Sequence, residues 1–148
     1  MNTTLITMKT IITILLSLLM ATACSNTSGK TSVENDSVKD GTLEVLYFHN
    51  AKRCATCIAI ENGTKELLQS TFREQLQDST IIFRTINIQD NKDLCEKYQI
   101  SWSSLIMVDH EDGKESVKNL TDFAFAKART NPEVFKNELS AQITNMLE

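Results

Sequence analysis

The chain has 148 residues, enough for one domain or one domain with appendages, which excludes a multidomain enzyme. Its 15 basic and 19 acidic residues give a formal charge of -4, and no block of like charge forms a basic stripe, so nucleic-acid binding is excluded as the main function. With 41% apolar residues and only four cysteines, the composition is that of a packed domain and not of a disulfide-dense mini-protein.

The N-terminal residues have the pattern of an export signal. Lys9 and the α-amino group supply positive charge, and the apolar run at 11–20 (IITILLSLLM) is well below the roughly 18 to 20 residues that span a bilayer as a helix. Small residues follow at 21–23, directly before Cys24. We therefore expect residues 1–23 to be a signal peptide that is removed when the chain leaves the cytoplasm.

The segment ATAC, at 21–24, fits two kinds of processing. A-x-A suits ordinary signal cleavage, whereas small residues before a cysteine resemble the bacterial lipoprotein box, although Ala21 stands where that box usually has a large aliphatic residue. We favour lipidation, because ordinary release would leave Cys24 as an unpaired thiol in an oxidising compartment. The prediction is a membrane anchor of several acyl chains on Cys24, with the domain in the cell envelope of a bacterium, facing the periplasm or the exterior.

Residues 24–41 predict a flexible tether, since they are small, polar or charged and have no apolar period. Such a tether reaches roughly 20 to 25 Å. Residues 42–148 are enough to bury a hydrophobic core without disulfides, and we expect them to form the folded domain.

The first half of this domain predicts a strand over 43–49 (LEVLYFH), a helix over 54–77 and a strand over 80–89, from β-branched and aromatic runs around a helical pattern. Gly63 weakens the helix by about 1 kcal/mol. In the second half, the sequence predicts a short helix over 92–98, capped by Asp90 or Asn91, and an apolar strand over 105–108. A turn at 110–113 and a polar strand over 114–120 follow. The last predicted element is a helix that begins at Asn131 and Pro132 and ends at about 147. The phenylalanines and alanines of 123–128 are expected to pack before that last helix. The order β-α-β-α-β-β-α indicates an α/β domain.

One motif carries chemistry, the C-x-x-C of Cys54 and Cys57, which follows a predicted strand and opens a predicted helix. Backbone N–H groups and the macrodipole at a helix N-terminus favour a thiolate, and Lys52 and Arg53 add positive charge, so we expect a depressed pKa for Cys54. Cys54 would attack a disulfide and Cys57, one turn inside the helix, would resolve the mixed disulfide.

Three other interpretations of the pair compete with exchange chemistry. A purely structural disulfide would close a very small loop and would stabilise the fold by only about 2 kcal/mol in the chain-entropy model, which a domain of this size does not need. A metal site would use His49 with both cysteines, but no second C-x-x-C or H-x-x-x-H accompanies them. The pair could also be a relic on a binding scaffold. Redox exchange, which needs no dissociable cofactor and no metal, is favoured over these.

The strand, the C-x-x-C at the strand-to-helix turn, and residues 98–100 leading into an apolar strand resemble the thioredoxin fold over 42–148. The resemblance implies a central mixed sheet flanked by helices. More narrowly, YFHNAKRCATC followed by Ile60 and Glu61 resembles exported bacterial proteins named as a nitrophenyl-compound nitroreductase subunit and associated with arsenic-resistance operons. The chain has no G-x-G-x-x-G and no room for a flavin site besides its fold, so it is not a nitroreductase on its own.

The chain departs from the thioredoxin pattern opposite the cysteines, where that family has a cis-proline. Ser104 stands at or next to this place, so we expect a trans loop whose serine hydroxyl bonds the active-site sulfur or a substrate backbone. Loss of the proline strengthens the metal alternative. Trp102 lies in the same loop; a core position is favoured over an apolar platform for a partner.

Two further side chains have alternative interpretations. For Cys95, a buried and inert thiol is favoured over a third redox partner. His49 can stabilise a thiolate when protonated, shuttle protons, or be an ordinary surface histidine, whereas His110 falls in a turn and needs no function.

The predicted function is therefore thiol–disulfide exchange with a protein partner by an exported, lipid-anchored domain. A reductant role requires electrons from a membrane thiol carrier, because exported compartments lack a soluble reducing pool, whereas an oxidant or isomerase role does not. The alternative is a non-catalytic binding or metal-handling lipoprotein, in which the same cysteines hold a thiophilic ion such as Cu(I) or As(III).

Overall fold

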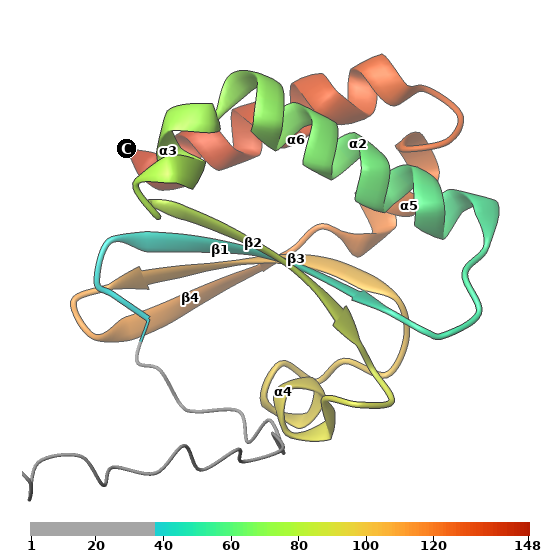
Figure 1. Cartoon of the computed structure of the whole chain (residues 1–148), viewed down its shortest axis with the longest axis horizontal. Helices are drawn as coiled ribbons and strands as arrows, with labels where there is room; N and C mark the ends of the chain where they lie inside the picture. The colour runs from blue at the N-terminus through green and yellow to red at the C-terminus, as the bar shows by residue number, and fades with distance from the viewer. Residues whose placement is uncertain (1–37) are drawn as a thin grey trace, which may run out of the picture. The chain divides into compact units, whose positions relative to one another are not determined.

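A computed structural model of the chain describes residues 38–148 (Figure 1). The predicted signal peptide, Cys24 and the tether up to residue 37 lie outside the described residues. No helix within 38–148 combines the length and the apolar character that crossing a bilayer requires.

The domain is built on a mixed sheet with the strand order β2-β1-β3-β4. Its strands are β1 (Thr42–His49), β2 (Ile81–Asn87), β3 (Ser104–Glu111) and β4 (Lys114–Asn119). β2 runs parallel to β1, whereas β3 is antiparallel to both β1 and β4. β1 is buried from Thr42 to Phe48, because it lies between two strands and is covered on both faces.

Helices cover the two faces of the sheet unequally (Figure 1). α2 (Ala55–Thr71), α3 (Arg73–Gln77), α5 (Thr121–Lys127) and α6 (Pro132–Leu147) lie on one face, and α4 (Lys92–Lys97) lies on the other. Each face has its own apolar cluster, and β1 supplies both by alternation: Leu43, Val45 and Tyr47 face α2, whereas Leu46 and Phe48 face α4. The mixed sheet flanked by helices is confirmed.

The single helix predicted over 54–77 is wrong at one point. Phe72 has non-helical dihedrals (φ -115°, ψ 34°) and separates α2 from α3. Its N–H still donates to the Leu68 carbonyl, and its ring is buried in the cluster beneath α2. Phe72 is four residues after the buried Leu68, so its side chain stays on the buried side although α2 ends there.

The structure adds a helix, α5, where residues 123–128 were expected only to pack before the last helix. Leu120, Ala124 and Ala128 are buried at i, i+4 spacing, which gives this short helix one apolar side. The Asn119 side-chain oxygen accepts from the Thr121 N–H before the first turn. The element order is therefore β-α-α-β-α-β-β-α-α and not the predicted β-α-β-α-β-β-α.

The β3–β4 hairpin is tighter than predicted. Asp112 and Gly113 alone form the turn, both with positive φ (52° and 68°), as two-residue hairpins require. His110 therefore belongs to β3 and not to a turn. The closing helix begins as predicted, with Pro132 in its first turn and the Asn131 side chain accepting from the Val134 N–H at 3.4 Å.

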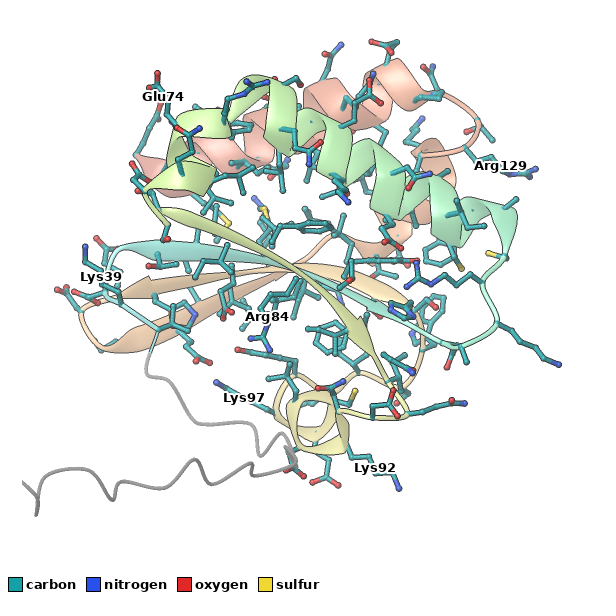
Figure 2. The ribbon with its side chains drawn as sticks, viewed as in Figure 1. Lys39, Glu74, Arg84, Lys92, Lys97 and Arg129 are labelled. Atoms are coloured by element: carbon teal, nitrogen blue, oxygen red, sulfur yellow. The ribbon has the colours of Figure 1, made fainter. Side chains whose placement is uncertain are left out.

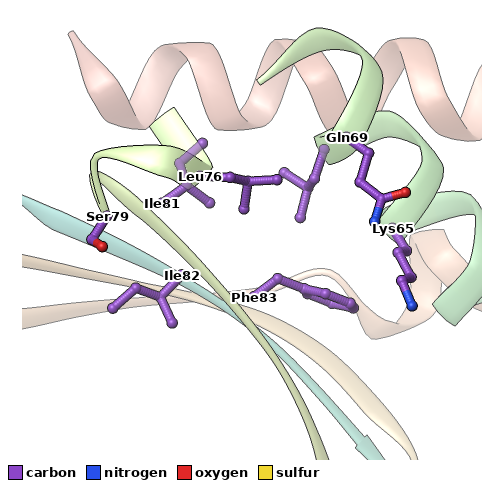
Figure 3. A pocket seen from close by; sticks show the side chains of 8 residues that line it. Lys65, Gln69, Leu76, Ser79, Ile81, Ile82 and Phe83 are labelled. Atoms are coloured by element: carbon purple, nitrogen blue, oxygen red, sulfur yellow. The ribbon is translucent and has the colours of Figure 1, made fainter. Parts of the chain in front are cut away.

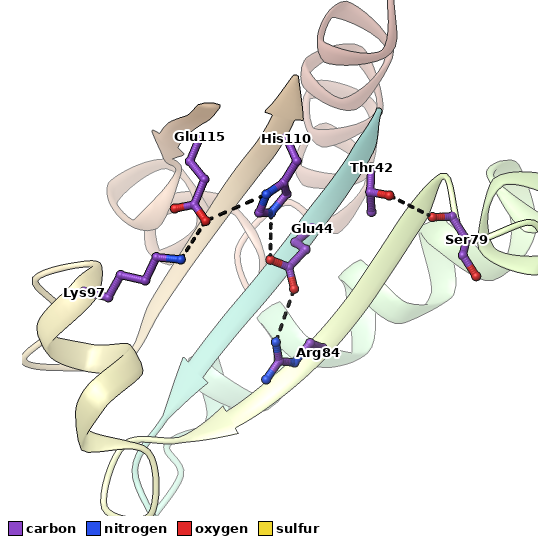
Figure 4. Close-up of polar contacts among 7 residues, drawn as sticks. All are labelled: Thr42, Glu44, Ser79, Arg84, Lys97, His110 and Glu115. Carbon is purple, nitrogen blue, oxygen red and sulfur yellow. Dashed lines mark hydrogen bonds and ion pairs between the residues drawn. The ribbon is translucent and has the colours of Figure 1, made fainter. Parts of the chain in front are cut away.

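A chain of ionic groups crosses the α4 face of the sheet (Figure 4). The buried Glu44 carboxylate on β1 accepts from Arg84 on β2 at 3.2 Å and contacts His110 Nε2 on β3 at 3.0 Å. Glu115 on β4 lies 3.8 Å from His110 Nδ1 and accepts from Lys97 of α4 at 2.6 Å. Figure 2 shows Arg84 on the α4 side of the sheet. His110 thus has a structural partner, contrary to the expectation of a free turn residue.

Candidate redox site

The two cysteines of the motif meet at the start of α2, where the chain leaves the central strand. Cys54 is the N-cap residue, with an extended backbone (φ -78°, ψ 165°), and its sulfur accepts from the Cys57 N–H at 3.2 Å. The two Sγ atoms are 2.7 Å apart, and both cysteines are free thiols. Cys54 is exposed and Cys57 is buried, so an incoming molecule reaches Cys54 first.

The pKa of Cys54 is lowered, as the sequence predicts. The largest cause is the hydrogen bond with the Cys57 thiol, followed by hydrogen bonding from the Cys57 backbone and, more weakly, from that of Thr56. These are N–H groups of the first turn of α2, which carry the positive end of the helix dipole. A thiolate at Cys54 therefore has its donors already in place.

Arg53 was expected to add positive charge to this thiolate, but its guanidinium is engaged elsewhere. Nη1 pairs with the carboxylate of Glu61 on α2, and Nη2 lies 2.6 Å from His49 Nε2 at the end of β1. Glu61 therefore balances the Arg53 charge, and the pair ties the loop before Cys54 to the strand and the helix. The other basic residue, Lys52, is exposed to solvent.

Both ring nitrogens of His49 are occupied in this arrangement. A guanidinium only donates, so Nε2 must accept from Arg53 and the ring proton must lie on Nδ1, which is 3.1 Å from the Asn50 carbonyl. Neither ring nitrogen of His49 contacts a cysteine of the motif in this arrangement. Of the three roles considered for His49, the contacts within residues 38–148 support neither thiolate stabilisation nor a proton shuttle, and they fit a histidine whose two nitrogens have structural partners.

Sequence reasoning missed a residue that contacts the motif from below. Tyr47 on β1 is fully buried, and its hydroxyl donates to the Cys57 carbonyl at 3.0 Å. Burial, and then the charge of Cys57, raise the pKa of Tyr47 strongly, so the phenol stays protonated. The strand alternation contains the signal, because Tyr47 shares the face of Leu43 and Val45.

The loop opposite the cysteines has trans peptide bonds, as expected, since no cis bond occurs in residues 38–148. The Ser104 hydroxyl, however, donates to the Trp102 carbonyl at 2.9 Å, and the side chain is buried. This hydrogen bond supports the loop, and among residues 38–148 the Ser104 hydroxyl makes no hydrogen bond with Cys54 or Cys57. The core position favoured for Trp102 is wrong: its side chain is 54% exposed and lies against Phe125 with the ring centroids 5.7 Å apart.

The third described cysteine is remote from the pair. Cys95 belongs to the apolar cluster on the α4 face, whereas Cys57 belongs to the cluster on the opposite face. It is buried, and burial raises the pKa of the Cys95 thiol. The expectation that Cys95 is buried is confirmed, and its lack of reactivity stays a prediction.

Two other features of the domain lie apart from this site. In residues 38–148, no three His, Cys, Asp or Glu side chains gather closely enough to hold a metal ion. A hollow of about 470 Å³ lies beside the outer edge of β2, between α2 and α3 (Figure 3). Leu76, Ile81 and Phe83 line it together with Lys65, and none of these side chains supplies redox chemistry.

No family model and no curated protein sequence matches the chain. Solved structures do. The Trx4 domain of ERdj5 has a TM-score of 0.50 at 15% identity, over 73% of this chain and 82% of that one. Thioredoxin from Fasciola hepatica has a TM-score of 0.48 at 19% identity, over 72% of this chain and 83% of that one. A thioredoxin variant from Halobacterium salinarum has a TM-score of 0.47 at 14% identity, over 76% of this chain and 84% of that one. Such identities concern the fold alone. The described domain has the thioredoxin-like fold, with a C-x-x-C pair at the helix that follows its central strand.

Proposed function

We propose that this protein exchanges thiols and disulfides with protein partners through Cys54 and Cys57. The observation that carries the proposal is the pair itself: an exposed sulfur with a lowered pKa, 2.7 Å from a buried second thiol at the start of α2. The thiolate is the nucleophile of disulfide exchange, and the nearby second thiol completes it. The resemblance of the fold to thioredoxins supports protein thiols and disulfides as the substrate class.

The reaction uses only groups that the pair and the partner supply. The Cys54 thiolate attacks one sulfur of a partner disulfide, and the other partner sulfur leaves as a thiolate. Cys57 then loses its proton and attacks the Cys54 sulfur, which releases the second partner sulfur. The cysteine pair is oxidised by two electrons, the partner disulfide is reduced, and the released proton goes to a partner thiolate.

We further propose that the domain works in a bacterial cell envelope, held to a membrane through an acylated Cys24 after removal of residues 1–23. This part rests on the sequence pattern alone. A membrane thiol carrier would supply electrons if the protein is a reductant. Kinship with the exported proteins named for a nitroreductase subunit stays a prediction from the YFHNAKRCATC segment, and no nitro reduction is proposed.

The exchange function is tested by equilibrating the full chain with glutathione buffers of graded poise and trapping the thiols by alkylation. A Cys54–Cys57 disulfide that forms and reduces reversibly supports the proposal; Cys54→Ser and Cys57→Ser are the controls that abolish it. Absence of this disulfide at every poise contradicts it. Tight, stoichiometric uptake of Cu(I) or arsenite, lost in Cys54→Ser, would then favour the metal-handling alternative.

The anchor is tested separately, by fractionating cells that express the full chain or its Cys24→Ser variant. Wild type is expected in the membrane fraction with an acylated N-terminal cysteine, and the variant is expected to lose the acyl mass. An unmodified Cys24 in the mature wild type contradicts lipidation but leaves the exchange chemistry unaffected.

A further inference from the structure

The resolving cysteine has an unusual neighbour for a residue that must lose a proton. Cys57 lies in the first turn of α2 with 6% of its surface exposed, directly above β1. Its polar contacts are the Cys54 sulfur at 2.7 Å and the Tyr47 hydroxyl, which donates to its carbonyl at 3.0 Å. Within residues 38–148, no carboxylate and no imidazole hydrogen-bonds with Cys57.

Resolution of a mixed disulfide makes this environment important. Once the Cys54 sulfur is bonded to a partner, it is no longer a thiolate, and it no longer accepts a strong hydrogen bond from the Cys57 thiol. Cys57 must then become a thiolate in a buried place, where a charge without a hydrogen-bond donor is unfavourable. The buried group at hand is a phenol, and a phenol that stays protonated can donate but cannot act as a base.

We infer that Tyr47 is a positioning residue for the resolving step: its buried O–H donates to the Cys57 carbonyl, which holds the first turn of α2 on β1 and keeps the Cys57 sulfur beside Cys54. This rests on the proposed exchange function. Tyr47 takes no proton: the proton of Cys57 passes to solvent or to the departing partner sulfur, the Cys57–Cys54 bond forms, and the Cys54–partner bond breaks. Burial raises the pKa of Tyr47 and the nearby charge of Cys57 raises it further, so the phenol stays protonated during the step.

Tyr47→Phe removes only the hydroxyl and keeps the buried ring, so the fold is expected to survive. The chain offers a matched control, because its other tyrosine, Tyr98, packs against Phe48 on the opposite face of the sheet. Each variant is made in the full chain carrying Cys24→Ser and Cys95→Ala, so that only Cys54 and Cys57 react.

The reagent is dithiobis(nitrobenzoate), whose coloured thiolate is released once when Cys54 attacks and again when Cys57 resolves. Stopped-flow absorbance gives both rates, and mass spectrometry identifies the adduct on Cys54. Tyr47→Phe is expected to leave the first rate within about twofold and to slow the second roughly tenfold, the effect of one lost buried hydrogen bond. Over a pH series, the second rate should reach half of its maximum at a higher pH in Tyr47→Phe than in the parent. In Tyr98→Phe, this pH should equal that of the parent.

An unchanged second rate in Tyr47→Phe overturns the inference. Equal slowing of both rates also overturns it, because a general loosening of α2 would affect attack and resolution alike. Failure of the proposed function looks different: the parent itself would release the coloured thiolate once and never resolve. If Tyr47→Phe is too unstable to assay, 3-fluorotyrosine is incorporated into the Tyr98→Phe parent, where Tyr47 is the remaining tyrosine. This keeps the ring and changes the strength of its O–H donor, so the second rate should change and the first should not; an unchanged second rate overturns the inference.

Discussion

Glu44→Gln is expected to lower the free energy of unfolding by about 1 to 2 kcal/mol while leaving the redox site intact. Glu44 is 3% exposed, and its carboxylate joins Arg84 and His110 across three neighbouring strands on the α4 face (Figure 4). Glutamine has the same shape and can still hydrogen-bond with both neighbours. The substitution therefore removes the charge and little else.

The two contacts of Glu44 contribute unequally. The Arg84 side chain is 41% exposed, so its pairing is screened by solvent and is worth about 0 to 1 kcal/mol. His110 is 12% exposed, and a hydrogen bond to a charged group there exceeds a neutral one by about 1 kcal/mol. Glu44→Ala removes the acceptor itself and leaves a cavity, so its loss should reach about 3 kcal/mol.

Urea unfolding followed by circular dichroism measures these differences, and the thermal midpoint should fall by roughly 4 to 8 °C in Glu44→Gln. Glu66→Gln is the matched control, because Glu66 also pairs with a cation, Lys136, but at the surface; no measurable change is expected there. A Glu44→Gln protein as stable as wild type, or more stable, would refute the reasoning, since it would mean that desolvation of the carboxylate outweighs its partners.

Four further outcomes are expected. Because the pKa of Cys54 is lowered, the rate of its reaction with iodoacetamide should have a pH midpoint below the ordinary thiol pKa of about 8.5. The folded state favours the thiolate, so the extra stability relative to Cys54→Ser should be fully present above pH of about 8.5 and should be lost as the pH falls through the lowered pKa of Cys54. Urea unfolding at a series of pH values measures this difference. Gly63→Ala should destabilise by about 1 kcal/mol despite a better helix former, because the new Cβ would lie 3.0 Å from the ring of the buried Phe135; equal or higher stability in urea contradicts this. Trp102→Ala should slow reduction of a disulfide-bonded test protein several-fold but leave a small disulfide unaffected, because the exposed ring contacts only a large partner. Cys95 should alkylate in the native protein far more slowly than Cys54, and at comparable rates in urea, because burial protects it.

What the sequence predicts well here is local. The strand at 43–49, the C-x-x-C at a helix start and the Asn131–Pro132 cap each depend on a few neighbouring residues, and each is present in the structure within a residue or two. Alternation and capping are short-range effects, so one sequence is enough to predict them. The lowered pKa of Cys54 follows for the same reason, because its donors are the next residues of its own helix.

The misjudged side chains depend on partners that are distant in sequence or chosen among competitors. Glu61 attracts the Arg53 guanidinium away from a role beside the thiolate, and that pairing in turn fixes the tautomer of His49. Trp102 is 54% exposed although its ring lies against Phe125 on α5, a helix that the sequence pattern did not predict. Both cases depend on side-chain contacts that the pattern of apolar and polar residues does not specify.

The alternation of β1 links the two properties that these experiments measure. Glu44 and Tyr47 are three residues apart on one strand and therefore face opposite sides of the sheet, one toward the ionic groups near α4 and the other toward α2. Changes on one side should be felt on the other only through the strands of the sheet, which contribute side chains to both clusters. Glu44→Gln should then alter stability without altering the resolution rate, whereas Tyr47→Phe should alter resolution more than stability. If both variants changed both quantities together, the sheet would be transmitting strain between its faces, and neither residue could be assigned to one side.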